Sequence, residues 1–272
     1  MDKTTLRKVQ LVQLEIAKEV KRVCEKHNIR YFLTAGTLLG AIRHKGFIPW
    51  DDDLDMVMLR EDYDKFLKIA PLELRPEYEI QNWHDDSKCP YEYSKIRKKG
   101  TVFVEGKGNP EKERGIYIDL FVFIHLPDDE EEIRQVTSQL VDLHRTLLMK
   151  CGFRPWYDEG RIIWKKRIGY ILYQFKALTK SYQKLVDEYE KCILRYPNSC
   201  NKMNEQILSL SFPVIQKKWY RSSVMVHFED DVFPAPVDYE KYLIENYGDY
   251  MQLPPENERE NRHQILKVSF GK

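Results

Sequence analysis

The chain of 272 residues has no long hydrophobic run, few cysteines and almost no net charge. Its most apolar stretch, residues 116–124, contains Asp119 and is far shorter than the ~20 residues that a membrane-spanning helix needs. Its first residues lack the apolar stretch of a secretory signal. The five cysteines are odd in number and form no C-x-x-C pair, which is typical of reduced packing residues. We therefore expect a cytoplasmic protein without disulfides or a structural zinc site.

Charge and composition narrow the class of protein further. Lys and Arg number 44 and Asp and Glu number 43, which gives a formal net charge of +1. A general nucleic-acid binder is usually strongly basic, so no nucleic acid is expected among the partners. A content of 42% hydrophobic and 12% aromatic residues excludes a disordered chain. A chain of this length also buries enough surface to fold without cross-links.

Hydrophobic periodicity predicts an α+β fold. Apolar residues at three- and four-residue steps indicate helices, and apolar runs between turns indicate strands. The first half mixes both, whereas the region after Pro127 begins with three helices. The helices are expected at residues 4–26, 38–43, 61–69, 130–149, 161–178 and 182–195, and the strands at 31–35, 53–59, 78–81, 91–97, 102–105 and 116–123.

Four acidic residues form the most informative pattern. Asp53 and Asp55 project from one face of their predicted strand, because successive side chains alternate, and Asp51 lies just before them on that side. Asp119 stands alone in a second, apolar strand, where a carboxylate is costly without a charged partner. Crowded carboxylates repel one another unless a cation intervenes, and Mg²⁺ or Mn²⁺ binds such carboxylates together with phosphate oxygens. The alternative is an acidic turn before an edge strand, since short D-x-D matches are common.

The residues before this cluster favour phosphate binding. Gly36 and Thr37 form a turn between a strand and a helix, where backbone N–H groups and a helix N-terminus are suited to hold a phosphate. Arg43, His44 and Lys45 lie between this turn and the acids, and they are suited to pair with phosphate oxygens. A phosphate cradle, a metal site and a basic flank together indicate phosphoryl or nucleotidyl transfer.

The chain resembles a known family in three blocks. The first block, GTLLGAIRHKGFIPWDDDLD (36–55), is similar to the signature of the LicD family, and the similarity resumes at YIDLF (117–121) and at FPAPVDYEKYLIENYGDYMQLPP (233–255). The resemblance implies a nucleotidyltransferase-like core, related also to the fukutin-type ribitol-phosphate transferases. It implies a metal-dependent phosphotransferase with a CDP-linked donor and a glycan acceptor. In the bacterial members that are most like this pattern, the group is phosphocholine from CDP-choline, and the acceptor is teichoic acid or lipopolysaccharide.

The resemblance also implies roles for single residues. Asp53 and Asp55 match metal ligands, and Asp51 matches an accessory acid. Asp119 matches either the remaining ligand or the base that accepts a proton from the attacking sugar hydroxyl. Thr37 stands where the general nucleotidyltransferase pattern has serine, and its spacing to the acids is longer than in that pattern. The expected parts are a catalytic core (1–127), a helical subregion (128–200) and a C-terminal segment that completes the core (201–272).

Two further groups of residues are candidates for contacts with the donor. Lys95 and Arg97 share one face of their predicted strand and are suited to hold donor phosphates; a charged, solvated edge strand is the alternative. Trp50 adjoins the acids and is the best candidate for a cation–π contact with choline. Packing is the other explanation for such rings. The other rings considered for an aromatic box are Trp83, Tyr91 and Tyr93.

The segment 161–186 is basic and amphipathic. It contains seven Lys or Arg and no acid, with Ile, Leu, Phe and Trp between them. Such a helix is suited to lie on an anionic membrane, which would bring a lipid-linked glycan acceptor to the protein at the inner face of the membrane. The alternative is a helix that packs its apolar side against the core.

Two other functions remain open from the sequence alone. A glycosyltransferase would use the D-x-D pattern to bind a nucleotide sugar, and a non-catalytic scaffold would bind glycan or membrane with the same fold. The acids at 53, 55 and 119 favour an enzyme over the scaffold.

His263, after the Leu-Pro-Pro stretch, is expected in a surface tail.

Overall fold

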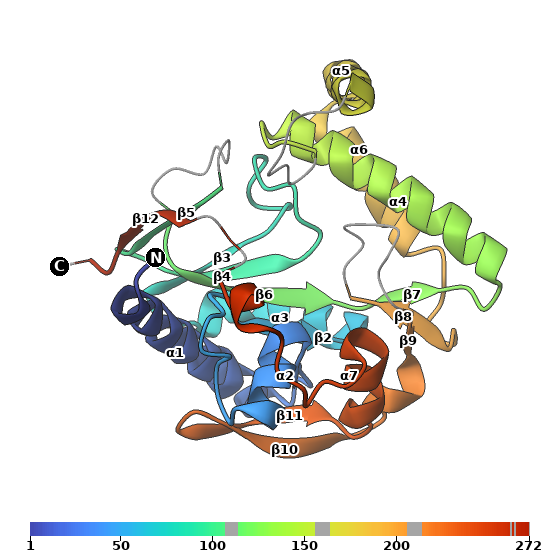
Figure 1. Ribbon diagram of the computed structural model, residues 1–272. Helices are drawn as coiled ribbons and strands as arrows, with labels where there is room; N and C mark the ends of the chain where they lie inside the picture. Colours follow the sequence, from blue (N-terminus) through green and yellow to red (C-terminus); the bar gives the residue numbers. More distant parts are fainter. Residues whose placement is uncertain (107–113, 156–163, 206–213, 262, 264, 272) are drawn as a thin grey trace.

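A five-stranded mixed sheet forms the centre of the molecule (Figure 1). The computed structural model describes residues 1–106, 114–155, 164–205, 214–261, 263 and 265–271. The strand order is β1-β2-β6-β4-β3, in which β2 and β6 are parallel and the other neighbours are antiparallel. The strands are β1 (Phe32–Leu33), β2 (Asp55–Met58), β3 (Tyr78–Gln81), β4 (Ser94–Lys98) and β6 (Tyr117–Val122). A mixed sheet with separate groups of helices agrees with the predicted α+β class.

Three helices of the first half pack against this sheet. Helix α1 contacts β4 and β6, α2 contacts β2, and α3 contacts β2 and β3. Helix α1 starts where Asp2 accepts hydrogen bonds from the N–H groups of Thr4 and Thr5, 2.9 Å each, and ends at the left-handed Asn28. The predicted apolar stripe of α1 is buried except for Val12, which is half-buried. The bounds are α1 (Lys3–His27), α2 (Ala35–Arg43) and α3 (Arg60–Glu73).

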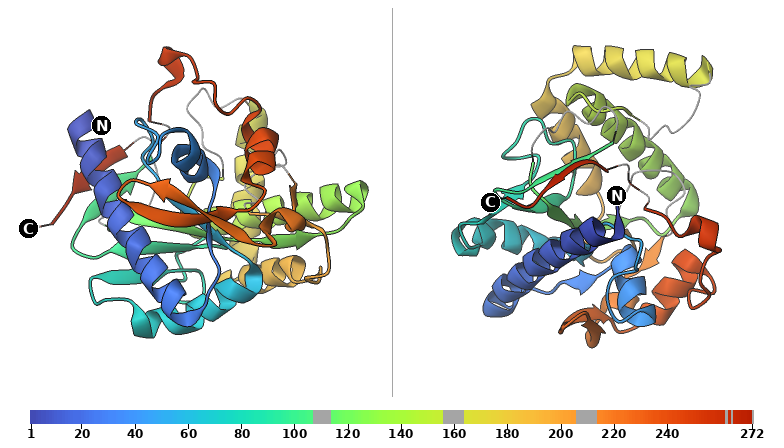
Figure 2. Two further views of the ribbon diagram at one scale, coloured as in Figure 1. Left: turned by 90° about the horizontal axis from the view of Figure 1, so that it is seen from below. Right: turned by 60° about the vertical axis from the view of Figure 1, so that its left-hand side comes forward.

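Three further helices lie to one side of the sheet, at the upper right of Figure 1. Helices α4 and α6 pack on each other, and their apolar side chains form a second hydrophobic cluster with Trp83, Ile124 and Leu126. Helix α5 packs on α4 at the margin of the molecule, as the right-hand view of Figure 2 also shows. The bounds are α4 (Glu130–Lys150), α5 (Trp164–Thr179) and α6 (Tyr182–Ile193), close to the predicted ones, although residues 161–163 lie outside the described part of the chain.

The C-terminal part adds small sheets around the core. The hairpin β10–β11 packs against α2 and β1, and β12 brings the end of the chain to β5. The Lys8 ammonium group lies 5.9 Å from the Phe270 ring, so the two ends of the chain are close. These elements are β5 (Val102–Glu105), β7 (Ile124–Leu126), β8 (Lys202–Asn204), β9 (Ile215–Gln216), β10 (Ser223–Phe228), β11 (Asp231–Pro236), α7 (Tyr239–Tyr247) and β12 (Ile265–Ser269), with 3₁₀ turns at Lys217–Tyr220 and Glu256–Glu258.

Two strands begin two or three residues later than predicted, and β1 and β6 begin one residue later. Strand β2 begins at Asp55 and not at Asp53, because helix α1 engages the preceding backbone: the Nε2 groups of Gln10 and Gln13 donate to the carbonyls of Asp51 and Asp52, 2.8 Å each. Strand β4 begins at Ser94 and not at residue 91.

Among the described residues, no helix is both long and apolar enough to cross a bilayer.

Candidate active site

Asp55 and Asp119 lie side by side in the middle of the sheet. They are register partners in the parallel β2–β6 pair, and the Asp119 N–H donates to the carbonyl of Leu54 at 3.0 Å. Partners on neighbouring strands project from the same face, with backbones roughly 4.8 Å apart. Both side chains are largely buried. The structure thus brings together two acids that are 64 residues apart in the sequence.

Burial and like charge act together on these acids. The pKa of the Asp55 carboxyl lies well above its ordinary value, first because the group is buried and then because Asp53 and Asp119 are close. The charges of Asp51 and Glu205 raise it further. All three acids named from the sequence with Asp55 therefore act on one electrostatic site, and Glu205 belongs to it as well.

Asp53 lies just before β2 and interacts with the C-terminal segment. His263 Nδ1 is 3.1 Å from Asp52 Oδ1 and 3.9 Å from Asp53 Oδ2. The hydrogen bond with Asp52, helped by nearby carboxylates, raises the pKa of His263 to about 10, so the imidazole is charged at neutral pH. Burial raises the pKa of Asp53, and the charge of His263 opposes that shift. His263 therefore lies at the acids, and its expected place in a surface tail is wrong.

The donor atoms of this site suit a hard divalent cation. Asp52, Asp53 and His263 are the His, Cys, Asp or Glu residues in the described part of the chain whose ligand atoms all lie within 4.8 Å of one another. Asp52 Oδ2 is buried and has no hydrogen-bond partner among the described residues. Carboxylate oxygens are the ligands that Mg²⁺ takes in proteins, and a divalent charge would offset the repulsion among Asp53, Asp55 and Asp119. The carboxylates fit the ion, whereas His263, which is charged at neutral pH, has no free lone pair to offer it. Asp55 and Asp119 are not part of the group within 4.8 Å, so the metal role of Asp53, Asp55 and Asp119 stays a prediction.

Lys95 pairs with Asp119 inside the sheet. The two residues are register partners on β4 and β6, and Lys95 Nζ lies 2.8 Å from Asp119 Oδ1. The ammonium group also lies 3.5 Å from the centroid of the Tyr117 ring. Burial raises the pKa of Asp119, whereas Lys95 acts to lower it. The alternative of a solvated edge strand is wrong, since β4 lies between β3 and β6 and Lys95 is 4% exposed.

Arg97 lies on the same face as Lys95 but makes internal hydrogen bonds. Its Nε donates to Gln81 Oε1 at 2.7 Å, and its Nη1 donates to the carbonyl of Gly115 at 2.9 Å. The side chain is 1% exposed. These bonds tie β4 to β3 and to the start of β6, so a contact between Arg97 and donor phosphates stays a prediction.

The start of α2 positions the acids. The N–H of Asp55 donates to Thr37 Oγ1 at 2.8 Å, which connects the first turn of α2 directly to β2. A Cβ at Gly36 would lie 2.8 Å from Asp51 Oδ2, closer than real Cβ atoms come, so any other residue at this position would displace the Asp51 carboxylate. Gly36 and Thr37 therefore lie at the acids, but in the first turn of α2, which begins at Ala35, and not in a turn before the helix as predicted. In this geometry the role of Thr37 is to hold the backbone of Asp55.

Glu205 was not predicted from the sequence. Its buried carboxylate accepts hydrogen bonds from Thr34 Oγ1 and from the Tyr242 hydroxyl, the latter at 2.5 Å. The N–H of Ala35, which has a positive φ of 46°, donates to the same hydroxyl at 3.1 Å. This network fixes the residues that begin α2. Nothing near Glu205 in the sequence signals it, because its partners come from distant segments.

The predicted basic flank, Arg43, His44 and Lys45 at the end of α2, lies in different environments. Arg43 Nη1 donates to the carbonyls of Tyr250 and Gln252, at 2.9 and 3.2 Å, and Arg43 Nε donates to His44 Nε2 at 3.0 Å. Arg43 thus fastens the segment after α7 to the end of α2. Lys45 is exposed and has a positive φ of 61°. Phosphate contacts of these three residues stay predictions.

The four aromatic rings considered from the sequence do not form one box. Trp50 is half-buried, and the guanidinium of Arg259 lies 5.8 Å from its ring centroid. Trp83 is buried in the second hydrophobic cluster. Tyr91 and Tyr93 stack on each other at 5.2 Å. The prediction of an aromatic box that includes Trp83 is therefore wrong, and Trp50 stays the candidate for a cation–π contact with choline.

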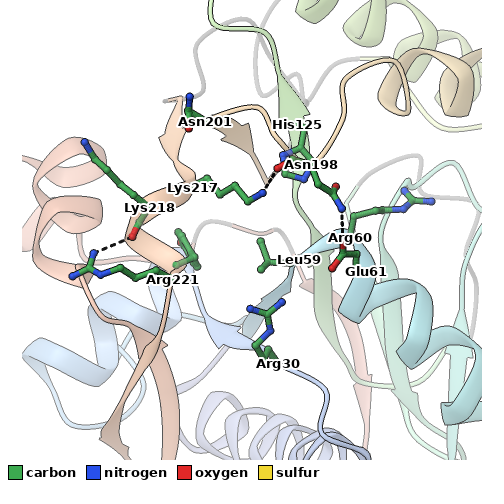
Figure 3. Close-up of a pocket in the computed structure, with 11 residues that line it drawn as sticks. Arg30, Leu59, Arg60, Glu61, His125, Asn198, Asn201, Lys217, Lys218 and Arg221 are labelled. Atoms are coloured by element: carbon green, nitrogen blue, oxygen red, sulfur yellow. Dashed lines mark hydrogen bonds between the residues drawn. The ribbon is translucent and has the colours of Figure 1, made fainter.

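A separate polar pocket of about 450 Å³ lies at the opposite end of β2 from Asp55 (Figure 3). Leu59, directly after β2, lines it together with several cations. Arg30 and Arg60 are each paired with an acid of α3 at 3.0 Å, which offsets their charge. None of the predicted site residues, all of which are described, lines this pocket.

Comparison with known proteins identifies the family. A family profile described as LicD/FKTN/FKRP, nucleotidyltransferase domain, matches residues 28–148. Over 270 residues the chain is 30% identical to the lipopolysaccharide cholinephosphotransferase LicD of Haemophilus influenzae, and the match covers 97% of each chain. Over 48 residues it is 48% identical to the human ribitol 5-phosphate transferase FKRP, which covers 18% of this chain and 10% of the relative. Because the similarity to the bacterial protein covers nearly the whole of both chains, this chain belongs to the LicD family.

Proposed function

We propose that this chain is a metal-dependent phosphotransferase that moves phosphocholine from CDP-choline to a hydroxyl group of a surface glycan precursor, teichoic acid or lipopolysaccharide. The name and the near full-length match of the Haemophilus influenzae relative support the transferred group and the glycan class. The family profile supports a nucleotidyltransferase-like core. The observation that carries the proposal is the juxtaposition of Asp55 and Asp119 on one face of β2 and β6.

Asp53, Asp55 and Asp119 would hold Mg²⁺ or Mn²⁺. When bound, the ion neutralises charge on the diphosphate of the donor and on the leaving nucleotide. The predicted phosphate contact of Gly36 and Thr37 would use N–H groups at the start of α2, because a helix N-terminus favours phosphate. Thr37 keeps Asp55 in place through its backbone, so this turn and the acids are fixed relative to each other.

The reaction also requires a group that accepts the proton of the attacking hydroxyl. In the proposed reaction, the acceptor oxygen forms a bond to the phosphorus of phosphocholine while the bond to the oxygen of CMP breaks. Asp119, which matches either the remaining ligand or the base, would accept this proton in the second role, and Lys95 at 2.8 Å favours the ionised carboxylate that accepts it. No covalent enzyme intermediate is required.

We also propose that the reaction takes place on the cytoplasmic side. The five cysteines, all in the described part of the chain, form no disulfide with one another, which suits a reducing compartment. The glycan precursor would then receive phosphocholine before it reaches the cell surface.

A transfer assay with purified protein tests the proposal. CDP-choline and nucleotide sugars are offered in parallel with a glycan acceptor and Mg²⁺, and CMP release and choline incorporation are measured. We expect turnover with CDP-choline, and a fall in kcat of ~10³-fold or more in Asp53→Ala and Asp55→Ala. Asp230→Asn is the matched control, because Asp230 is an exposed acid that pairs with Lys18.

Each competing function gives a different result in that assay or in calorimetry. Turnover with a nucleotide sugar in place of CDP-choline would show a glycosyltransferase. Calorimetry that detects neither Mg²⁺ nor CDP-ligand binding would show a non-catalytic scaffold. Near-normal turnover of Asp53→Ala or Asp55→Ala at saturating Mg²⁺ would contradict the metal role of these acids.

A further inference from the structure

Helix α5 directs its apolar side chains away from the protein. The exposed fractions of its large apolar residues are high, at 50% for Ile168, 64% for Ile171, 57% for Leu172, 67% for Phe175 and 77% for Leu178. The expectation that this helix packs its apolar side against the core is therefore wrong. Monomeric proteins rarely expose a contiguous apolar surface of this kind without a partner for it.

The exposed residues form one face. Ile168, Ile171, Phe175 and Leu178 recur at steps of three and four residues, which places them in a single row on an α-helix. The other side of α5 is held to α4 by polar contacts: Lys150 Nζ donates to the carbonyl of Ala177 at 2.9 Å. Lys176 forms an ion pair with Asp142 of α4 at 2.6 Å. Polar contacts toward the protein and apolar side chains toward solvent are the reverse of a core-packing helix.

Position and charge indicate what covers this face. Both Figure 1 and the right-hand view of Figure 2 show α5 at the outer margin of the molecule, beyond α4. The segment 161–186 has seven Lys or Arg and no acid. Lys176 and Lys180 are paired with Asp142 and Glu188, whereas Arg167 beside the apolar row is exposed. A basic segment with an apolar face is complementary to a surface that has negative headgroups above hydrocarbon.

We propose that α5 docks the protein on an anionic lipid bilayer, with its apolar row inserted at the boundary between headgroups and acyl chains. A second copy of the chain fits this face less well, because a two-fold contact would bring two segments of the same positive charge together. The inference does not depend on the proposed function, although a bilayer-bound enzyme would meet a lipid-linked acceptor on the same surface.

Sedimentation with lipid vesicles tests this inference. The full-length protein is mixed at low salt with vesicles of phosphatidylglycerol and phosphatidylcholine, or of phosphatidylcholine alone. We expect binding to the anionic vesicles to exceed binding to the neutral ones by ~10-fold or more, and to weaken with salt. The double variant I171E/F175E is expected to lose ~10-fold or more of the binding to anionic vesicles.

Leu72→Glu is the matched control, because Leu72 is an exposed leucine of α3, 88% accessible, and lies on another part of the surface. It should bind vesicles as the unmodified protein does. Circular dichroism and CDP-choline binding should be unchanged in I171E/F175E, which separates this inference from the proposed function. Equal binding of unmodified protein and I171E/F175E, or no binding to anionic vesicles at low salt, would overturn the inference. A dimer in sedimentation velocity that I171E/F175E abolishes, without vesicle binding, would assign the face to a second copy instead.

Discussion

Lys95 and Asp119 form a buried ion pair across β4 and β6, with Lys95 Nζ 2.8 Å from Asp119 Oδ1. Asp55 is the neighbour of Asp119 on the other side, and burial and nearby acids raise its pKa. Burial raises the pKa of both carboxyls, but on Asp119 the ammonium group of Lys95 opposes that shift, whereas on Asp55 other acids add to it. This asymmetry suits Asp119 as proton acceptor and Asp55 as metal ligand in the proposed reaction.

Substitution of Lys95 tests that asymmetry. In Lys95→Met the Asp119 carboxylate loses its counter-charge, so its pKa rises and the acidic limb of the pH–rate profile moves to higher pH. The free energy of unfolding should fall by ~3 kcal/mol or more, because one partner of a buried pair remains charged. Urea unfolding measures the loss. The double variant K95M/D119N should recover much of it, and equal stability of Lys95→Met and the unmodified protein would show that the pair is not coupled.

The charge of Asp55 should lower the stability of the folded protein, although the proposed phosphocholine transfer requires this residue. Its pKa in the folded protein lies above its ordinary value, so its contribution to stability is present at low pH and is lost as pH rises through that raised pKa. Asp55→Asn removes the charge, and we expect its Tm at pH 7 in EDTA to exceed that of the unmodified protein by ~2–4 °C. Mg²⁺ should raise the Tm of the unmodified protein more than that of the variant. A lower Tm of Asp55→Asn in EDTA would contradict this account.

Thr37 offers a test with a close control. Thr37→Val keeps the shape of the side chain but leaves the buried N–H of Asp55 without its acceptor, which costs ~1–3 kcal/mol of stability. Because Asp55 then shifts, kcat should fall as well. Thr37→Ser retains the hydroxyl and should stay near the unmodified protein in both urea unfolding and transfer. A Thr37→Val variant with unchanged kcat would separate the hydrogen bond from catalysis.

The local parts of this fold follow from the sequence. The stripe of α1 and the long helices of the second half match their expected bounds within a few residues, because a period of 3.6 residues is a strong signal over long segments. The proximity of Asp55 and Asp119 was also expected, since both lie in apolar strands where a carboxylate needs a partner.

Long-range pairings explain what the sequence could not predict. Glu205 reaches Thr34 and Tyr242 through the fold alone, and His263 meets Asp52 because β12 returns to β5. The orientation of α5 was ambiguous, since an amphipathic pattern does not tell whether the apolar side meets the core or another surface.

The pair of His263 and Asp52 should make stability depend on pH. The pKa of His263 is raised to about 10, above its ordinary value near ~6.5, so the stabilising charge is fully present below pH ~6.5 and is lost as pH rises through about 10. We expect the difference in Tm between the unmodified protein and His263→Gln to be larger at pH 6 than at pH 10. Thermal unfolding at both values measures it. A difference that grows with pH would contradict the assigned charge.

The central claim is that Asp53, Asp55 and Asp119 hold a divalent cation against the diphosphate of the donor. Isothermal titration calorimetry of CDP-choline in Mg²⁺ and in EDTA tests it most directly, with the D55N/D119N variant and the Asp230→Asn control beside the unmodified protein. We predict that Mg²⁺ tightens binding by ~10-fold or more in the unmodified protein and in the control, and leaves D55N/D119N unchanged. Equal CDP-choline affinity in Mg²⁺ and EDTA for the unmodified protein would contradict the claim.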